Sequence, residues 1–458
     1  LIGRTKTLAQ NADHLRFAIV SCSNYQAGYF NAYQRIAERN DLDALIHLGD
    51  YIYEYADQVY GDENLFSERQ LDPLEEIIDL EDYRIRYSNY RLDTQLIRFN
   101  QQHPIIAVWD DHESANDAYV DGAENHTEGD EGSWEERKAN ARKVYFEWMP
   151  IRDNENQSVY RTFNYGDLAD LVMIDTRLEG REEQILDIEN PALYDPNRTL
   201  LGAEQKEWFK EQLDNSDAKW KIIGNQVIFS EFNVGWAADT SMGQTYQSLE
   251  NIFLDIWDGY PAERDELIDH IAGNDIDNVV WLTGDFHSSF AFDVAKRPSM
   301  LPFLAGVSQD MADYNPETQE GSIAVEFATP SVTSANFDEN VGEFVAAFLE
   351  NQINTELPGL GINANPHMKF TDLDRHGYFV LDITEGKAQA DYYYTVIDQI
   401  TTDELFETGQ FSNNGENRLN TSADEAAPKE EQDIPAPPQP PMVSSTQEVA
   451  TLKLFSLY

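Results

Sequence analysis

The sequence predicts a fold of the α/β class, because two kinds of segment alternate along most of the chain. From about residue 13 to residue 400, short apolar runs with the length of buried strands alternate with amphipathic stretches of helical period. Hydrophobic residues make up 41% of the 458 residues and include 23 Tyr, 23 Phe and 8 Trp, enough to fill a sizeable core. We therefore expect one large domain over residues 13–400.

The expected elements follow from the length and period of each segment. Strands are expected at Phe17–Cys22, Ala44–Asp50, Ile105–Asp110, Leu171–Asp175, Lys221–Gly224, Val279–Thr283, Ala324–Ala328 and Tyr378–Ile383. Helices are expected at Phe30–Arg39, Glu81–Gln101, Trp134–Trp148, Ala203–Leu213 and Glu263–Ala272. One of these helices has a clear start signal, since an apolar-periodic run opens at Gly202-Ala203-Glu204-Gln205.

Both ends of the chain are expected to lie outside this domain. Residues 1–12 are predicted to be a linker or the remnant of a preceding domain. Residues 401–458 form a polar tail that passes through the acidic, Pro-rich run Ile434–Pro441, which has no means of packing a core. The final residues Leu452–Tyr458 resemble the opening of the C-terminal sorting domain used by type IX secretion systems, and a chance β-strand explains them equally well.

The charge balance disfavours nucleic acid as a partner. The chain carries 84 acidic and 32 basic residues, a net charge of −52 that repels polyanions. Such a charge is typical of a solvated acidic surface in a salty medium, and it is compatible with retention of divalent cations. No run reaches the roughly 18 consecutive apolar residues of a membrane span. No signal peptide is visible, and because residue 1 is Leu we expect a processed or trimmed chain.

Four predicted strands end in polar residues that can bind metal. The residues at these ends are Cys22; Asp50, with Tyr53 three residues later; Asp110, Asp111, His112 and Glu113; and Asp285 with His287. In open α/β sheets, ligand sites collect just beyond the carboxyl ends of the strands, so we expect one convergent site. Each motif alone is also compatible with a turn, a solvated cap or a core position. Cys22 is the single cysteine, so it forms no intrachain disulfide.

The order of these residue types resembles the signature of the PhoD-like branch of the calcineurin-like metallophosphatase superfamily. This branch has Cys22, Asp111 and Asp285 where the wider superfamily has Asp, Asn and His. The resemblance also covers Glu81–Arg84, Tyr90-Arg91, Ala141–Pro150, Val172–Arg177 and Asn365–Phe370. It implies a four-layer αββα sandwich with two mixed sheets, and Gly3–Thr7 looks like the last strand of the small β domain that normally precedes the catalytic one.

The resemblance also implies roles for individual residues. Ferric iron would be bound by Cys22, Asp50, Tyr53 and His287, and calcium by Asp50, Asp111 and Asp285, with Asp50 bridging the two metals. The donor chemistry agrees, since thiolate, phenolate and imidazole suit iron while carboxylates suit Ca²⁺. Gln226 is a further candidate oxygen ligand, and Asp110 either ligates or supports Asp111.

The activity implied by this resemblance is hydrolysis of phosphate mono- and diesters by a hydroxide that bridges the metals. His112 would assist the leaving group, and Asn116 would orient a phosphate oxygen. We expect a secreted, periplasmic or cell-surface enzyme of the alkaline phosphatase type, with small phosphate esters and the type IX machinery as partners. The alternatives are a phosphodiesterase or phospholipase-D-like enzyme, a phosphotriesterase, and a calcium-dependent surface binding protein without turnover. The intact residues Asp50, His112 and His287 argue against the last of these.

Overall fold

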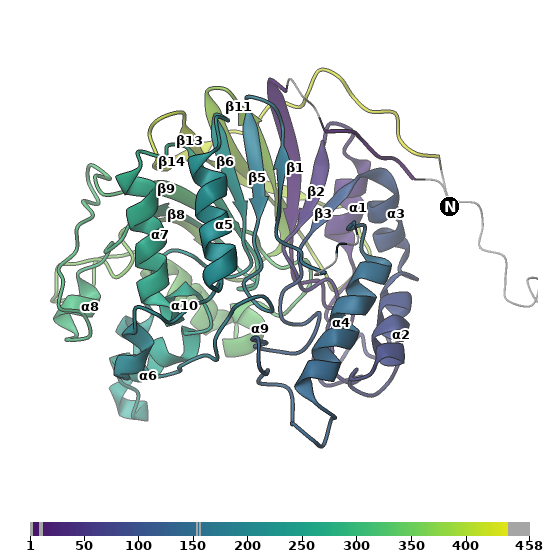
Figure 1. The fold of residues 1–458 in the computed structure, drawn as a ribbon, viewed down its shortest axis with the longest axis horizontal. Helices are drawn as coiled ribbons and strands as arrows, with labels where there is room; N and C mark the ends of the chain where they lie inside the picture. Colours follow the sequence, from purple (N-terminus) through teal and green to yellow (C-terminus); the bar gives the residue numbers. More distant parts are fainter. Residues whose placement is uncertain (1–2, 9–11, 153, 155–156, 438–458) are drawn as a thin grey trace, which may run out of the picture.

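Two seven-stranded sheets face each other in the computed structural model of the chain (Figure 1), which describes residues 3–8, 12–152, 154 and 157–437. The strand order is β14-β13-β12-β11-β1-β2-β3 in the first sheet and β10-β8-β9-β7-β6-β5-β4 in the second. In the first sheet β1, β2 and β3 are parallel, and in the second β5, β6, β7 and β9 are parallel. All other strand pairs in the two sheets are antiparallel, so both sheets are mixed.

The bounds of the elements are as follows. The strands are β1 His14–Val20, β2 Ala44–His47, β3 Ile105–Ala107, β4 Arg161–Asn164, β5 Ala169–Met173, β6 Trp220–Gly224, β7 Val279–Thr283, β8 Ser289–Val294, β9 Ala324–Ala328, β10 Met368–Asp372, β11 His376–Thr384, β12 Lys387–Thr395, β13 Leu405–Asn413 and β14 Asn420–Ala423. The α-helices are α1 Asn31–Glu38, α2 Leu80–Tyr90, α3 Thr94–Gln102, α4 Trp134–Trp148, α5 Ala203–Asp214, α6 Tyr246–Glu250, α7 Pro261–Gly273, α8 Leu301–Leu304, α9 Phe337–Val341 and α10 Glu343–Gln352. Short 3₁₀ helices lie at η1 Pro191–Tyr194, η2 Gly235–Ala237, η3 Thr240–Met242, η4 Asn251–Phe253 and η5 Trp257–Gly259.

Apolar side chains hold the layers together. Between the sheets, Phe327 of β9 packs against Phe379 of β11 with ring centroids 6.2 Å apart, inside one buried cluster that includes residues of both sheets. On the outer face of the second sheet, Trp281 of β7 stacks on Phe229 at 3.7 Å, in a cluster shared with α5 and α7. Helices α1 to α4 contribute to the cluster that contains the first sheet. The predicted α/β fold with two mixed sheets is therefore confirmed.

The strand order brings the carboxyl ends of the parallel strands to one edge of the molecule, on the side of α9 in Figure 1. The predicted strands are all present, but four of them end earlier than expected: β1, β2, β3 and β5 stop at Val20, His47, Ala107 and Met173. The polar residues predicted to close these strands therefore lie in the loops just beyond them.

Other differences have local causes. The single helix predicted at Glu81–Gln101 is two helices, because the Asp93 carboxylate accepts hydrogen bonds from Gln95 N–H and Leu96 N–H and so begins α3. Strands β4, β8, β10, β12, β13 and β14 were not among the predicted strands. None of the helices among the described residues is long and apolar enough to cross a membrane.

The packed body also continues beyond the predicted boundary at residue 400. Strand β13 pairs with β12, and β14 pairs with β13, so both extend the first sheet. The boundary at 400 is therefore too early, because strands rich in polar residues still complete a sheet. The described part of the tail remains in contact with the domain, since Ala436 N–H donates to the side-chain oxygen of Gln102 on α3. The segment Leu452–Tyr458 lies outside the described residues. At the N-terminal end, Arg4 N–H donates to Gln101 O. That residues 1–12 are a linker or the remnant of a preceding β domain stays a prediction.

Candidate metal centre

Four of the predicted ligand residues have a left-handed backbone conformation. The φ angles are 59° at Cys22, 55° at Asp50, 61° at Asp285 and 64° at His287. For residues other than glycine this region is sparsely populated and costs about 1–3 kcal/mol each, so it persists only where the surroundings impose it. All four lie just after β1, β2 or β7. Backbone strain gathered at one edge of the sheets is a mark of a functional site.

The segment that follows β9 fixes Cys22 between the two sheets. Val332 N–H donates to Ser21 O at 3.0 Å, and Ser334 N–H donates to Cys22 O at 3.2 Å. On the other side Gly284, at the end of β7, approaches so closely that a Cβ there would lie 2.8 Å from the Ser21 Cβ. A residue larger than glycine would push the sheets apart at this point, so Gly284 allows the ligands of the two sheets to meet.

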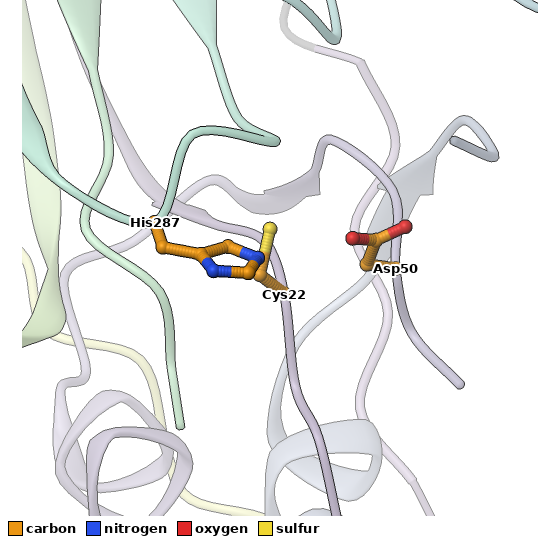
Figure 2. A group of neighbouring side chains, drawn as sticks. All are labelled: Cys22, Asp50 and His287. Carbon is orange, nitrogen blue, oxygen red and sulfur yellow. The ribbon is translucent and has the colours of Figure 1, made fainter. Parts of the chain in front are cut away.

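A first ligand group consists of Cys22, Asp50 and His287, which offer ligand atoms within 4.8 Å of one another. Figure 2 shows these side chains converging from three separate loops. His287 donates from Nδ1 to Ala335 O at 2.7 Å, which leaves Nε2 free to ligate. The hydroxyl of Tyr53 lies 3.4 Å from this Nε2 and donates to Asp50 Oδ2 at 3.0 Å.

The donor set of this first group, in which a thiolate and an imidazole stand beside oxygen donors, fits a transition metal. Asp50 Oδ1 is buried and has no hydrogen-bond partner among the described residues. Burial, followed by the Asp50 charge, raises the pKa of the Cys22 thiol well above its ordinary value, so a thiolate here needs a cation beside it. Thiolate, imidazole, phenolate and one carboxylate suit iron, as predicted for Cys22, Asp50, Tyr53 and His287.

A second group contains Asp110, Asp111 and Asp285, whose carboxylate oxygens also lie within 4.8 Å of one another. The fully buried guanidinium of Arg177 stands among them. It donates to Asp110 Oδ1 at 2.5 Å, to Asp285 Oδ1 at 2.8 Å and to Asp255 Oδ2 at 2.6 Å. Asp110 Oδ2 is buried, and no residue in the described part of the chain forms a hydrogen bond with it. An all-carboxylate set with a vacant buried oxygen fits a hard cation such as Ca²⁺.

The electrostatics of the second group indicate a shortage of positive charge. Burial and then the charge of Asp110 raise the pKa of Asp285 well above its usual value, although Arg177 acts in the opposite direction. Burial also raises the pKa of Asp110, to about 6. One guanidinium therefore does not fully compensate these carboxylates, and a bound cation would lower both pKa values.

A third set, Asp50, Asp111 and His112, lies within the same 4.8 Å limit and links the two groups, since it shares Asp50 with the first and Asp111 with the second. The carboxylate of Glu113 fixes this arrangement: Oε2 accepts from Asp50 N–H at 2.9 Å and from Asp110 N–H at 2.8 Å. Gly49 permits the contact, since a Cβ there would lie 2.3 Å from the Asp110 Cβ. The loops after β2 and β3 are thus held as one unit, in which Asp50 faces both groups.

His112 is held by Glu54, a residue that the sequence analysis did not single out. Glu54 is fully buried, and its Oε2 lies 2.7 Å from His112 Nδ1. Its Oε1 accepts from Asn116 N–H and from the Asn125 side chain. Burial by itself lowers the pKa of His112, but Glu54 and then Asp50 raise it well above its ordinary value. The contact with Glu54 thus fixes the His112 ring beside the two ligand groups and favours its charged form. The sequence feature that could have identified Glu54 is its position directly after Tyr53, one of the predicted ligands.

The side chains of two predicted site residues are engaged elsewhere. The amide of Gln226 accepts from Thr176 N–H at 2.9 Å and donates to Ile174 O at 2.8 Å, which makes it part of the second sheet's structure. These contacts do not support the predicted oxygen-ligand role of Gln226. Asn116 directs its Nδ2 to Glu124 at 3.3 Å on the exposed side, so its contact with Glu54 comes from the backbone. Its predicted role in orienting phosphate has no support from these contacts.

Arg177 and Asp255 are the other residues of the centre that the sequence analysis missed. Arg177 lies at the end of the segment Val172–Arg177, which formed part of the family resemblance but carried no assigned role. Asp255 belongs to no motif. It pairs with Arg177 and with Arg181, 78 and 74 residues away, so only the folded chain shows its place.

Comparison with known proteins agrees with this geometry. The sequence profile described as PhoD-like phosphatase matches residues 17–392. Alkaline phosphatase D of Bacillus subtilis (strain 168) is 33% identical over 405 residues, which cover 85% of this chain and 61% of that protein. A solved structure of PhoD superposes with a TM-score of 0.74 at 29% identity, covering 93% of this chain and 75% of the other. The chain therefore belongs to the PhoD-like phosphatase family.

Proposed function

We propose that this protein is a metal-dependent phosphoric ester hydrolase of the alkaline phosphatase type, acting on phosphate mono- and diesters. The observation that carries the proposal is the position of Asp50, a member of the first ligand group that also lies within ligand distance of Asp111 of the second and of His112. Two adjacent cation sites with a proton donor form an arrangement suited to displacement at phosphorus. Membership of the PhoD-like phosphatase family supports the same reaction class. The chain spans 61% of the length of the Bacillus relative, so the activity of the whole protein is part of this proposal.

The metals we propose are ferric iron and calcium. Iron would be held by Cys22, Asp50, Tyr53 and His287, and calcium by Asp50, Asp111 and Asp285, with the vacant Oδ2 of Asp110 as a further donor. Bound ions of this kind lower the pKa of water and neutralise phosphate charge during in-line attack. Arg177 would keep the carboxylates of the second group in place.

The chain's own contribution to the chemical step is a proton. His112, charged and oriented by Glu54, would donate from Nε2 to the oxygen of the departing alcohol as the bond from phosphorus to that oxygen breaks. The departing group would leave as a neutral alcohol, and His112 would regain its proton from solvent. Glu54 acts through His112 and is a positioning residue, because it fixes the ring and favours its charged form.

The proposed location is outside the cytoplasm: secreted, periplasmic or at the cell surface. The net charge of −52 supports it, because such a surface stays soluble in a salty medium. Export by the type IX machinery rests on residues 452–458 and stays a prediction.

The reaction itself can be tested with nitrophenyl esters. Purified protein should release nitrophenol from both p-nitrophenyl phosphate and bis-p-nitrophenyl phosphate. Prolonged treatment with a chelator should abolish the release, and added calcium and iron should restore it, since both ligand groups need their cations. Circular dichroism before and after chelation separates loss of metal from unfolding. Absence of nitrophenol release by the metal-loaded protein would instead favour a calcium-dependent binding protein.

His112→Ala should slow hydrolysis by about 10²–10⁴-fold, which is the usual contribution of a positioned general acid. The loss should be larger for alkyl esters than for nitrophenyl esters, because poor leaving groups need the proton most. Glu54→Gln should show the same dependence on the leaving group with a smaller loss, since the ring remains but its charge is less favoured. The control is His270→Ala, which removes a surface histidine on α7 that pairs with Asp214. Equal losses across leaving groups would exclude the acid role of His112.

Cys22→Ser should change the colour and the iron content of the purified protein. Thiolate and phenolate both donate charge to ferric iron, so we expect a visible charge-transfer band that Cys22→Ser and Tyr53→Phe each shift or bleach. Tyr29→Phe is the matched control, because the Tyr29 hydroxyl bonds Glu68 at the exposed surface. Metal content is measured by plasma emission on the same samples. A colourless, iron-free and fully active wild-type enzyme, indistinguishable from Cys22→Ser, would make Cys22 a small apolar core residue.

A further inference from the structure

A cavity of about 520 Å³ lies outside the metal centre, bounded by α6, the start of α7 and α8 on the left of Figure 1. Phe232 forms part of its wall and packs against Phe286 with ring centroids 5.1 Å apart. Phe286 stands between Asp285 and His287 in the chain, so an aromatic layer separates the cavity from the metal ligands. The proposed hydrolysis makes no use of this cavity.

Two carboxylates on its wall lack a cationic partner. Neither Glu231 nor Glu250 forms an ion pair within the part of the chain that the structure describes. Glu231 Oε1 accepts from the Asn233 amide at 2.8 Å, and Glu250 Oε1 accepts from Val234 N–H and Gly235 N–H at 3.0 and 2.6 Å. Both side chains are thus held in place by neutral donors alone. Burial raises the pKa of Glu231 to about 7 and that of Glu250 to about 8, as expected for carboxylates without a counter-ion.

The two arginines on the same wall already have carboxylate partners. Arg264 pairs with Asp258, and Arg297 donates two hydrogen bonds to Asp265, at 2.7 and 2.5 Å. Asp258 and Asp265 also line the cavity, so each arginine is neutralised locally. Glu231 and Glu250 are therefore the groups of the cavity whose ionised forms lack a positive partner, and a bound cation would favour their ionisation.

The rest of the lining is aromatic and apolar. Tyr194, Phe232 and Tyr246 present rings, and Leu254 and Pro302 add apolar surface. Aromatic faces attract organic cations, and the attraction grows when water is excluded. A bare metal ion does not fit as well: among the described residues, no set of clustered metal-ligating atoms includes Glu231 or Glu250.

We propose that this cavity binds a small organic cation, an ammonium group with an apolar body. Its charge lies between Glu231 and Glu250, and its body packs against the rings of Tyr194 and Tyr246. The site is separate from the metal centre and does not depend on the proposed reaction. It takes its specificity from charge and aromatic contact together, so a neutral molecule of the same shape binds more weakly.

Calorimetric titration of the full chain at physiological salt tests this directly. The probe is choline, and the matched control is 3,3-dimethylbutanol, in which a carbon replaces the charged nitrogen. Choline should bind with one site per chain and at least about tenfold more tightly than the neutral isostere. Glu231→Gln and Glu250→Gln should each weaken choline binding by about tenfold while preserving the fold, because both changes are isosteric. Glu317→Gln, at an exposed position outside the cavity, should leave binding unchanged.

Two substitutions of Tyr194 test the contribution of the aromatic rings to choline binding. Tyr194→Leu should weaken choline binding several-fold, whereas Tyr194→Phe, which keeps the ring, should not. Equal binding of choline and its isostere would overturn the proposal and leave an apolar cavity. Equal losses in Glu317→Gln would also overturn it, since the acidic surface as a whole would then hold the cation. Binding of inorganic phosphate in place of choline, or no binding of choline, tetramethylammonium and propylammonium, would contradict it as well.

Discussion

The guanidinium of Arg177 is the cation on which the arrangement of the metal-binding edge depends. It is fully buried and touches Asp110 after β3, Asp285 after β7 and Asp255 before η5. These contacts join loops of both sheets at one point. Removing one partner of a buried ion pair costs about 3–5 kcal/mol, because the remaining charges stay buried without compensation. Here, several carboxylates would be left at once. The carboxylates of the second ligand group therefore form a cluster because this arginine holds their oxygens together.

The left-handed residues Cys22, Asp50, Asp285 and His287 show what this rigidity makes possible. Each turns a side chain off the end of a strand and toward the space between the sheets. The contacts of Glu113 with the loops after β2 and β3, and the docking of Ser334 on Cys22, hold these conformations against their strain. The centre is thus preorganised by the protein, so the ligands do not have to be assembled by the metal. Glu54 does the same for His112, which it holds charged and oriented.

The sequence was informative where chemistry and local pattern coincide. Strand ends followed by Cys22, Asp50, Asp111, Asp285 and His287 predicted a convergent site, because parallel strands deliver such residues to one edge. The element types were also predictable, since Phe17–Val20 of β1 and Val279–Leu282 of β7 are continuous apolar runs, and the apolar run of β9 is broken only by Glu326.

The other features of the fold and the site depend on contacts between distant parts of the chain, which a local sequence pattern does not reveal. Asp255 and Arg177 are 78 residues apart, and only the fold shows that they meet. Strand β13, Leu405–Asn413, is mostly polar and partly exposed, so its place in the sheet depends on pairing with β12 and not on its own hydrophobic pattern. Gln226 looked like a ligand from its position after β6, but the buried hydroxyl of Thr176 uses its oxygen, at 2.6 Å. A free amide and a satisfied one look the same in a sequence.

The central claim is that two different cations share Asp50 at this edge. Anomalous diffraction from crystals of protein purified without added metal, recorded on both sides of the iron edge, tests it most directly. We predict an iron peak among Cys22, Asp50, Tyr53 and His287, and a second peak that lacks the iron edge beside Asp50, Asp111 and Asp285. Absence of any peak at Cys22, or two identical metals bound only by carboxylates, would contradict the account.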